Sequence, residues 1–240
     1  MKILVVGGGG REHAIVWKIA QSPKVDKIYC APGNGGIAEL AECVDIAATD
    51  IENIVKGATD NSIDLVMFAL EVAHQLGMVD AMEKEGIRAF GPRANAAIIE
   101  GSKAFSKELM KKYNIPTANY EVFTDSTSAI DYIKAQNTFP TVIKADGLAL
   151  GKGVIIAQNL EEAEQAVHEM IDDGKFGKSG SRVVIEEFLT GPEVSVLAFT
   201  DGKTVKPMVS AQDHKRAYDN DEGLNTGGMG TFSPSRLYDD

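Results

Sequence analysis

The sequence predicts an α/β fold whose N-terminal part is an open parallel sheet with helices on both faces. Residues Ile3–Val6 are a continuous apolar run, which suits a strand buried on both faces of a parallel sheet. Similar short runs recur at Lys27–Ala31, Asp64–Ala69 and Ile87–Phe90. Helical spacing of apolar residues separates them, first over 11–19 and later up to about residue 85. This alternation is typical of a doubly wound sheet.

Composition narrows the class of protein. The chain has 240 residues, and its 24 Lys and Arg against 35 Asp and Glu give a net charge of −11. Apolar residues make up 44%, enough for a core that needs no disulfide or metal. The negative charge argues against nucleic-acid binding, which requires a basic face. It leaves ATP binding open, because a phosphate pocket is a local arrangement of lysines and backbone N–H groups.

The cysteines and the N-terminus carry no signal for export or metal. Cys30 and Cys43 match no zinc spacing and are expected to be small buried apolar residues. The start MKILVVGGGG has an apolar stretch too short for a signal peptide. Without a run of about 18 apolar residues, no membrane span or membrane partner is expected. We therefore expect a soluble, cytoplasmic protein.

The first glycine-rich loop, Gly7–Gly10, invites a dinucleotide-binding interpretation. Gly7 and Gly9 fit the G-x-G-x-x-G pattern, but its third position is Glu12. The second strand ends in Ala31-Pro32, where an acidic residue would be needed for a ribose. A dinucleotide oxidoreductase is therefore disfavoured. Two interpretations stay open: an anion site at a helix N-terminus, suited to a sugar phosphate, or a tight turn without a ligand.

Loops at the carboxyl ends of parallel strands are where such sheets bind ligands. In this sequence those ends carry three segments, at 7–10, 32–36 and 69–74. We expect them to lie along one edge of the sheet.

The middle of the chain is predicted to be helical and then extended. Helices are expected around 96–99 and over Ala104–Tyr113, followed by an extended stretch over Asn119–Phe123. Thr124 or Asp125 is expected to cap a helix over 129–134.

A lysine on an apolar strand is the strongest single signal in this part of the sequence. Lys144 lies on the predicted strand Pro140–Ala145 and must reach solvent or meet an anion. The glycine-rich loop at 146–153 then leads into a strand over Val154–Ala157. It is not a P-loop, because it is one residue too short, lacks the final Ser or Thr, and does not open a helix. It is either a flap over phosphates or a plain hairpin.

The last hundred residues contain one helix and several strands. Leu160–Ile171 has the apolar spacing of an amphipathic helix, and 182–188 is a strand. That strand carries Glu186 and Glu187, which as neighbours must face opposite sides. Asp201-Gly202 predicts a hairpin between strands at 193–199 and 204–211. The segments 212–216 and 225–230 are rich in groups that bind anions or carboxylates.

Taken together, these motifs resemble the phosphoribosylamine–glycine ligase family, also called glycinamide ribonucleotide synthetases, of the ATP-grasp superfamily. The resemblance runs through essentially the whole chain in order. It rests on GGGGREHA at 7–14, APGNGG at 31–36, EGSKAFSK at 100–107, VIKADGLALGKGV at 142–154, VIEEFLTGPEVS at 184–195, SAQDHKR at 210–216 and NTGGMGTFSP at 225–234.

The resemblance implies a reaction in purine synthesis. ATP would phosphorylate the carboxylate of glycine, and the amine of 5-phosphoribosylamine would attack the glycyl phosphate to give glycinamide ribonucleotide, ADP and phosphate. The glycine-rich flap would keep water from the acyl phosphate. It also implies a division into an N-terminal α/β domain over 1–101 and an ATP-grasp domain (α+β) over 102–240. The latter would contain a lid at about 123–190 and be incomplete at its C-terminal end.

The family's site residues carry over in three groups. The ATP group comprises Lys103, Lys144, Gly151, Lys152, Gly153, Glu186, Glu187, Phe188, Leu189 and Glu193. The phosphoribosylamine group comprises Gly9, Gly10, Arg11, Glu12, Asn34, Gly35 and Gly36. Around glycine and the transferred phosphoryl group are Asp213, His214, Lys215 and Arg216, implied to be catalytic, with Thr226, Gly227 and Gly228. His214 is expected to bind rather than to act as a base.

Two departures from the family pattern matter. The family motif G-P-E-x-P-L is replaced by ALEVAH at 69–74, which should loosen the phosphoribosylamine pocket. The resemblance also puts the ligands for Mg²⁺ (or Mn²⁺) beyond residue 240, so we expect this chain to lack ligase activity by itself. The alternative is a short nucleotide-binding or partner-binding module without turnover.

Overall fold

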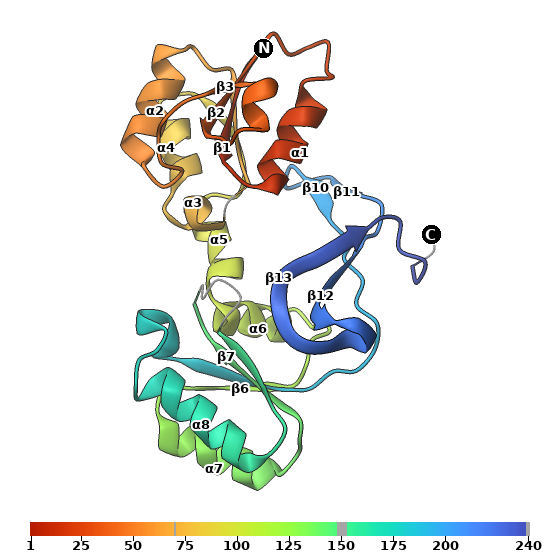
Figure 1. The fold of residues 1–240 in the computed structure, drawn as a ribbon. Coiled ribbons are helices and arrows are strands. Elements are labelled where there is room, and N and C mark those ends of the chain that lie inside the picture. Colours follow the sequence, from red (N-terminus) through yellow and green to blue (C-terminus); the bar gives the residue numbers. More distant parts are fainter. Residues whose placement is uncertain (70, 148–152, 239–240) are drawn as a thin grey trace. The chain divides into compact units, whose positions relative to one another are not determined.

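The computed structural model describes residues 1–69, 71–147 and 153–238 (Figure 1). The chain forms two compact units, Met1–Ile115 and Pro116–Asp240, which we call unit 1 and unit 2. Each unit is described by itself below.

Unit 1 contains one parallel sheet, as the sequence predicts. Its strands lie in the order β3-β2-β1-β4-β5, and every neighbouring pair is parallel. The strands are β1 (Lys2–Gly7), β2 (Lys27–Pro32), β3 (Glu42–Cys43), β4 (Leu65–Phe68) and β5 (Arg88–Phe90). The sequence does not predict β3, because two residues are too few for a periodic pattern.

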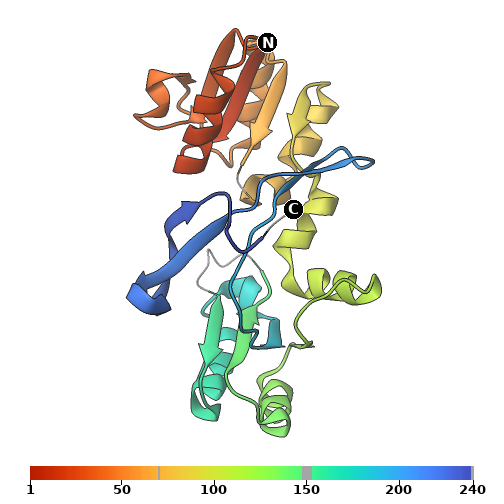
Figure 2. The same cartoon turned by 90° about the vertical axis from the view of Figure 1, so that its right-hand side faces the viewer.

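Helices cover both faces of this sheet, and alternation along β1 explains why. Ile3 and Val5 pack with Val16 of α1 on one face, while Leu4 and Val6 pack on the other with buried residues of α2 and α4. Figures 1 and 2 show α1 on the side of the sheet opposite α2 and α4. The helices of unit 1 are α1 (Gly10–Ile19), α2 (Ile51–Asp60), α3 (Glu71–Gln75), α4 (Met78–Lys84), α5 (Ala94–Gly101) and α6 (Lys103–Lys112), with a 3₁₀ turn η1 (Ile37–Glu39).

Two helical details differ from expectation. The helix expected up to about residue 85 is two helices, α3 and α4, because Gly77 has a φ of +80° and breaks the helical path. Helix α2 is not predicted from the sequence. Two features of the sequence could have indicated it. Asp50 is an N-cap residue, and in the structure its Oδ1 accepts from the backbone N–H of Asn53 at 3.2 Å. Ile54 and Ala58, one turn apart, are both buried.

Unit 2 begins with an antiparallel sheet in the order β6-β9-β7-β8. Helices α7 and α8 pack on the face that carries Ile143 and Ile185, which leaves Lys144 and Glu186 on the other face. Asp125 caps α7, as expected for one of the two candidates. The elements are β6 (Tyr120–Phe123), α7 (Ser126–Gln136), β7 (Thr141–Ala145), β8 (Val154–Ala157), α8 (Leu160–Ile171), η2 (Gly177–Gly180) and β9 (Val183–Glu187).

The end of unit 2 consists of two antiparallel strand pairs. The hairpin of β10 (Ala198–Thr200) and β11 (Val205–Pro207) is the predicted one, with shorter strands, and Asp201 Oδ1 accepts from the N–H of Thr204 at 2.7 Å. The strands β12 (Gln212–Tyr218) and β13 (Glu222–Phe232) form a second pair around the turn η3 (Asp219–Asp221). This strand pair is not predicted from the sequence. No helix in the described ranges is long and apolar enough to cross a membrane.

Candidate functional site

The two glycine-rich loops of unit 1 are in direct backbone contact. The N–H of Gly33 donates to the carbonyl of Gly7 at 3.1 Å, and Asn34 Nδ2 donates to the carbonyl of Gly8 at 2.9 Å. A Cβ on Gly8 would lie 2.6 Å from the carbonyl oxygen of Gly33. Only glycine permits this approach, so the loops after β1 and β2 form one surface at the carboxyl ends of those strands.

Asn34 holds the second loop in shape. Its Oδ1 accepts from the N–H of Ile37 at 2.9 Å while its Nδ2 reaches Gly8, so one side chain joins the two loops. Gly36 packs against His13 of α1, because a Cβ there would lie 2.5 Å from the ring. Gly35 is exposed and has open space around it.

Glu12 has turned inward. Its residue is only 3% exposed, and Oε2 accepts from the N–H of Gly9 at 2.7 Å across the first turn of α1. A Cβ on Gly7 would lie 2.6 Å from Glu12 Cγ, so this side chain fills the space below the loop. In a dinucleotide site the third glycine allows the helix to pack closely on the strand. Here the Glu12 side chain occupies that position, which gives a physical reason for disfavouring the dinucleotide interpretation.

Arg11 connects the first loop to the third. It is exposed, and Nη1 donates to the carbonyl of Ala69, just after β4, at 3.1 Å. Gly9 and Gly10 are exposed at the N-terminus of α1, where backbone N–H groups and the helix dipole favour an anion. The three loops therefore meet at one edge of the sheet, as predicted. The segment expected to be loosened is helical from residue 71, where α3 begins.

In unit 2, Lys144 forms an ion pair while its side chain stays partly exposed. Its Nζ lies 2.8 Å from Glu186 Oε2, and the Glu186 side chain is 5% exposed against 26% for Lys144. The register pairs Lys144 with Val184, so the two charges lie diagonally across β7 and β9 on one face. The partial exposure of the Lys144 side chain is compatible with contact to a ligand.

Glu187 faces the other way, as its position in the strand predicts. It is exposed, and its carboxylate accepts from the N–H and from Nδ2 of Asn119 at 2.9 and 3.0 Å. Phe188 and Leu189 follow β9 and are 38% and 64% exposed. The strand thus ends in an exposed segment next to the buried Glu186.

An ion pair next to the predicted flap involves two residues that are not among the site residues predicted from the sequence. Asp146, the first residue after β7, is 7% exposed and accepts from Arg182 Nε at 2.8 Å. Gly153 is buried, and its carbonyl accepts from the N–H of Ala145 at 2.8 Å, so both ends of the predicted flap are tied to the sheet. The predicted residues Gly151 and Lys152 lie outside the described ranges. Asp146 could have been identified from the sequence, because it is a carboxylate directly after an apolar strand.

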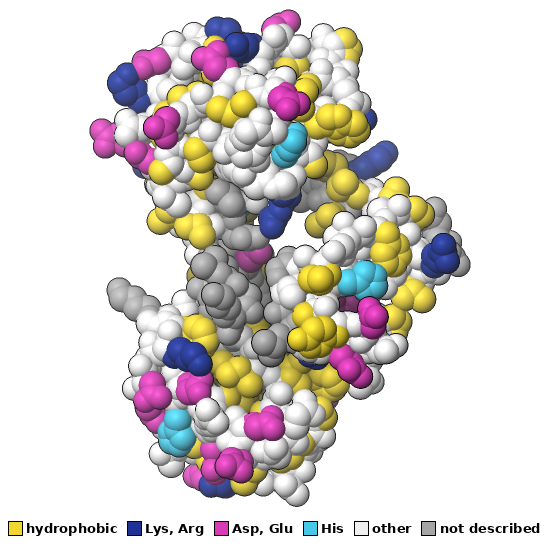
Figure 3. Space-filling model, viewed as in Figure 1, with side chains coloured by type: hydrophobic (Ala, Val, Ile, Leu, Met, Phe, Trp, Pro, Cys, Tyr) yellow, Lys and Arg dark blue, Asp and Glu magenta, His cyan; other side chains and the backbone are white. Residues whose placement is uncertain are grey.

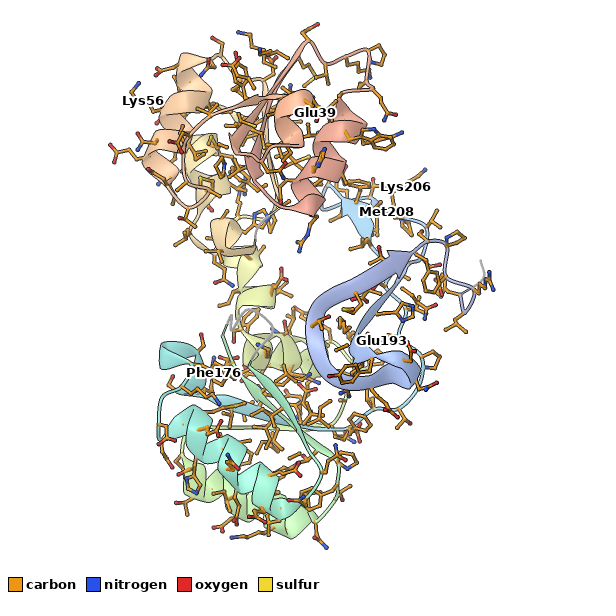
Figure 4. All side chains as sticks on the ribbon, in the orientation of Figure 1. Glu39, Lys56, Phe176, Glu193, Lys206 and Met208 are labelled. Carbon is orange, nitrogen blue, oxygen red and sulfur yellow. The ribbon has the colours of Figure 1, made fainter. Side chains whose placement is uncertain are left out.

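The pair β12 and β13 carries a second charged cluster. Lys215 Nζ lies 3.3 Å from Glu193 Oε2 and 3.6 Å from Asp213 Oδ2 (Glu193 is labelled in Figure 4). Burial alone would lower the pKa of Lys215, but these two carboxylates outweigh it and raise the pKa above its usual value. Lys215 is therefore a firmly protonated cation.

The remaining predicted residues of this cluster lie on the same strand pair. Thr226 Oγ1 donates to the carbonyl of Lys215 at 2.8 Å and accepts from the N–H of Gly228 at 3.1 Å, within the strand that also includes Gly227. Arg216 Nη1 donates to the carbonyl of Gly223 at 2.6 Å. The exposed ring of His214 lies 5.7 Å from that of Phe232, and further apolar side chains are exposed on β12 and β13. Figure 3 shows apolar side chains at the surface of this part of unit 2.

Lys103 falls in the other unit from the rest of the predicted ATP group. It is the first residue of α6, directly after Ser102, whose Oγ accepts from the N–H of Phe105 at 3.1 Å. Lys103 belongs to unit 1 and Lys144 to unit 2. Among the described residues, no group of three or more His, Cys, Asp or Glu is suited to hold a metal ion.

The two cysteines differ in burial. Cys30 is fully buried on β2, as expected, and its Sγ donates to the carbonyl of Gly7 at 3.3 Å. Cys43 on β3 is exposed, so the expectation that it is buried is wrong: β3 lies at the edge of the sheet. Burial raises the pKa of the Cys30 thiol from 9.0 to about 11.

We expect the raised pKa of Cys30 to appear as a loss of stability in alkali. Between pH 9.0 and about 11 the unfolded thiol loses its proton while the folded thiol keeps it, so the free energy of unfolding falls as the pH rises. The loss due to Cys30 should approach about 2 kcal/mol at the upper end. This loss is measured by urea unfolding of the unmodified chain and of Cys30→Ala, each at pH 8 and at about pH 10.5. An equal alkaline loss in Cys30→Ala would contradict the assignment.

Comparison with solved structures defines the class of protein. The crystal structure of a phosphoribosylamine–glycine ligase from Thermotoga maritima matches 99% of this chain and 56% of its own, with a TM-score of 0.81 and 32% identity. The biotin carboxylase domain of the Hydrogenobacter thermophilus 2-oxoglutarate carboxylase, in complex with MgADP, ADP and bicarbonate, covers 91% of this chain and 51% of its own. Its TM-score is 0.73 at 19% identity, which shows a shared fold. The chain thus has the fold of the ATP-grasp proteins.

Family models then give the particular family. Residues 1–100 match the N domain of phosphoribosylglycinamide synthetase, and residues 101–240 match its ATP-grasp (A) domain. The chain belongs to the phosphoribosylglycinamide synthetase family. Phosphoribosylamine–glycine ligases of Halalkalibacterium halodurans and Haemophilus influenzae are each 53% identical, over 240 and 237 residues. The chain covers 56% and 55% of the length of these curated relatives.

Proposed function

We propose that this chain is the ATP- and phosphoribosylamine-binding part of a phosphoribosylamine–glycine ligase. In the proposed reaction ATP phosphorylates the carboxylate of glycine, and the amine of 5-phosphoribosylamine displaces phosphate from the glycyl phosphate. The products are glycinamide ribonucleotide, ADP and phosphate. The observation that carries the proposal is the contact between the loops after β1 and β2 beside Arg11, a surface suited to a sugar phosphate.

In unit 1 the phosphate of phosphoribosylamine would meet N–H groups at Gly9 and Gly10 and the guanidinium of Arg11. The exposure of all three supports this assignment. Asn34, Gly35 and Gly36 would line the sugar from the second loop. Glu12 is assigned a positioning role, because its carboxylate is buried and caps the same helix end.

In unit 2 the ammonium of Lys144 would neutralise ATP phosphates, and the flap residues Gly151, Lys152 and Gly153 of the same family motif would contribute. Lys103 belongs to unit 1, and its proposed contact with ATP phosphates rests on its family motif alone. Glu186, Glu187, Phe188 and Leu189 would line the adenine edge, and the exposed carboxylate of Glu193 would accept from the ribose hydroxyls. We propose 102–240 as the ATP-grasp portion. Its proposed lid, at about 123–190, would contain β7, β8 and β9 together with helices α7 and α8.

Glycine and the transferred phosphoryl group would bind at β12 and β13. Lys215 is held protonated by Glu193 and Asp213, so it offers a stable positive charge to a carboxylate or phosphate. Arg216 would add a second cation, and His214 would bind rather than remove a proton. Thr226, Gly227 and Gly228 would contribute hydroxyl and backbone donors. The cluster lowers the energy of a negatively charged transition state by charge complementarity.

Among the described residues there is no cluster of three or more His, Cys, Asp or Glu that could hold a divalent cation. We expect the 240-residue chain by itself to bind nucleotide without releasing phosphate. A phosphate-release assay with ATP, glycine and phosphoribosylamine tests this, and turnover would contradict it.

Binding by each unit tests the proposal directly. Calorimetric titrations of the 240-residue chain with ATP and with ribose 5-phosphate, a stable relative of phosphoribosylamine, should each give saturable binding. Arg11→Gln should lower the affinity for ribose 5-phosphate by about tenfold, because one charge-assisted contact is lost, and should leave the affinity for ATP unchanged. Arg88→Gln, on β5, is the matched control and should change neither. Failure of ribose 5-phosphate to bind the unmodified chain would overturn the phosphoribosylamine assignment.

A further inference from the structure

The two cysteines of the chain are register partners. Strands β2 and β3 are parallel, and Cys30 pairs with Cys43, so both side chains point to the same face of the sheet. Both also lie against Gly33, because a Cβ built on that residue would clash with Cys43 Sγ and lie 3.5 Å from Cys30 Cβ. We propose that Cys30 and Cys43 form a thiol pair that hydrogen peroxide oxidises to a disulfide between β2 and β3.

The two thiols are suited to different steps. Cys43 is exposed and meets the oxidant first, whereas Cys30 is fully buried and its pKa is raised to about 11. The Cys43 thiolate attacks the peroxide, the O–O bond breaks, and a sulfenic acid and hydroxide result. The Cys30 sulfur then attacks the Cys43 sulfur, and the departing hydroxide takes the Cys30 proton to leave as water. Two thiols and one peroxide thus give one disulfide and two waters.

The geometry of β3 permits the bond. Neighbouring strands lie about 4.8 Å apart, within the Cα separations of roughly 4.4–6.8 Å that disulfides span. Strand β3 has only two residues and lies at the sheet edge, next to β2 alone. The shift needed to bring the two sulfur atoms together would therefore fall on β3 and the exposed turn before it.

Oxidation would reach the loops of the candidate site. Cys30 Sγ donates to the carbonyl of Gly7 at 3.3 Å, and Cys43 Sγ donates to that of Asn34 at 3.8 Å. Each thiol therefore supports one of the two loops that contact each other, and a disulfide removes both donor protons. Resting on the proposed function, we infer that the oxidised chain binds a sugar phosphate more weakly.

Intact mass measures the bond itself. The reduced chain is treated with hydrogen peroxide, then unfolded in urea with iodoacetamide so that every remaining thiol is alkylated. The expected product has lost two hydrogen atoms and carries no alkyl group, and reduction before alkylation restores two alkylation sites. Cys30→Ser and Cys43→Ser should give no such product. Two alkylated cysteines after treatment of the unmodified chain, or a bond only between two chains, would overturn the proposal.

Binding separates this inference from the proposed function. Ribose 5-phosphate should bind the oxidised chain about tenfold more weakly than the reduced chain, in the usual range for coupled sites. Dithiothreitol should restore the affinity of the oxidised chain. Peroxide treatment should not change the affinity of the Cys43→Ser variant for ribose 5-phosphate. A disulfide that forms without an affinity change would refute the coupling alone. An absence of binding to the reduced chain would refute the proposed function while the mass result still decides the thiol pair.

Discussion

Replacing Gly8 by alanine should separate the two glycine-rich loops of unit 1. The added methyl group would lie 2.6 Å from the carbonyl oxygen of Gly33, a contact that only a shift of backbone relieves. We expect the free energy of unfolding to fall by about 2 kcal/mol, as for other overpacked sites. The affinity for ribose 5-phosphate should fall by about tenfold or more. The loops after β1 and β2 would both contact this ligand, so separating them misplaces its binding groups.

Gly10→Ala is the matched control, two residues away in the same loop. A Cβ on Gly10 meets nothing within 4 Å, and the residue begins α1, where alanine is the better helix former. Its stability should stay equal or rise slightly. Urea unfolding followed by fluorescence measures both variants, since the single tryptophan, Trp17, lies on α1 in unit 1. Equal unfolding midpoints for Gly8→Ala and Gly10→Ala would show that the loop contact is not a constraint.

Replacing Lys144 by methionine should weaken the binding of nucleotide to unit 2. The substitution keeps an unbranched side chain that is only one atom shorter, and it removes the ammonium 2.8 Å from Glu186 Oε2, whose side chain is 5% exposed. The largely buried carboxylate then loses this ion pair, so the free energy of unfolding should fall by about 2 kcal/mol. Affinity for a fluorescent ATP analogue should fall at least about tenfold, because a charge-assisted phosphate contact is lost.

Lys134→Met provides the comparison for Lys144→Met. Lys134 also forms an ion pair in unit 2, with Glu164 at 2.7 Å, but the two side chains are 50% and 34% exposed. Solvent screens such a pair, so its removal should change stability and nucleotide affinity little. Circular dichroism in urea and the binding titration measure both. If the two variants bind the analogue equally well, Lys144 does not contact the phosphates.

Local patterns predicted much of the fold. Apolar runs located β1, β2, β4 and β5, and the spacing from Leu160 to Ile171 bounded α8 to the residue. Asp201-Gly202 located the hairpin of β10 and β11. These elements are found because a buried strand, an amphipathic helix and a tight turn each need a residue pattern within a few positions.

Other elements lack such a pattern. β13 contains four glycines and alternates poorly, so its identity as a strand depends on its pairing with β12. β3 is too short to show a period, and the division of the helix at Gly77 depends on a backbone conformation. In each case the decisive interaction is with residues elsewhere in the chain.

For the candidate site, the sequence by itself determined which residue types are available and near which strand ends they lie. Only the tertiary structure decided what each does: Glu12 caps its own helix, and Lys144 meets Glu186 from 42 positions away. It also joined Asp146 to Arg182 and aligned Cys30 with Cys43. The physical reason is that hydrogen bonds and ion pairs depend on distance in space. Periodicity records only which face of its own element a side chain occupies.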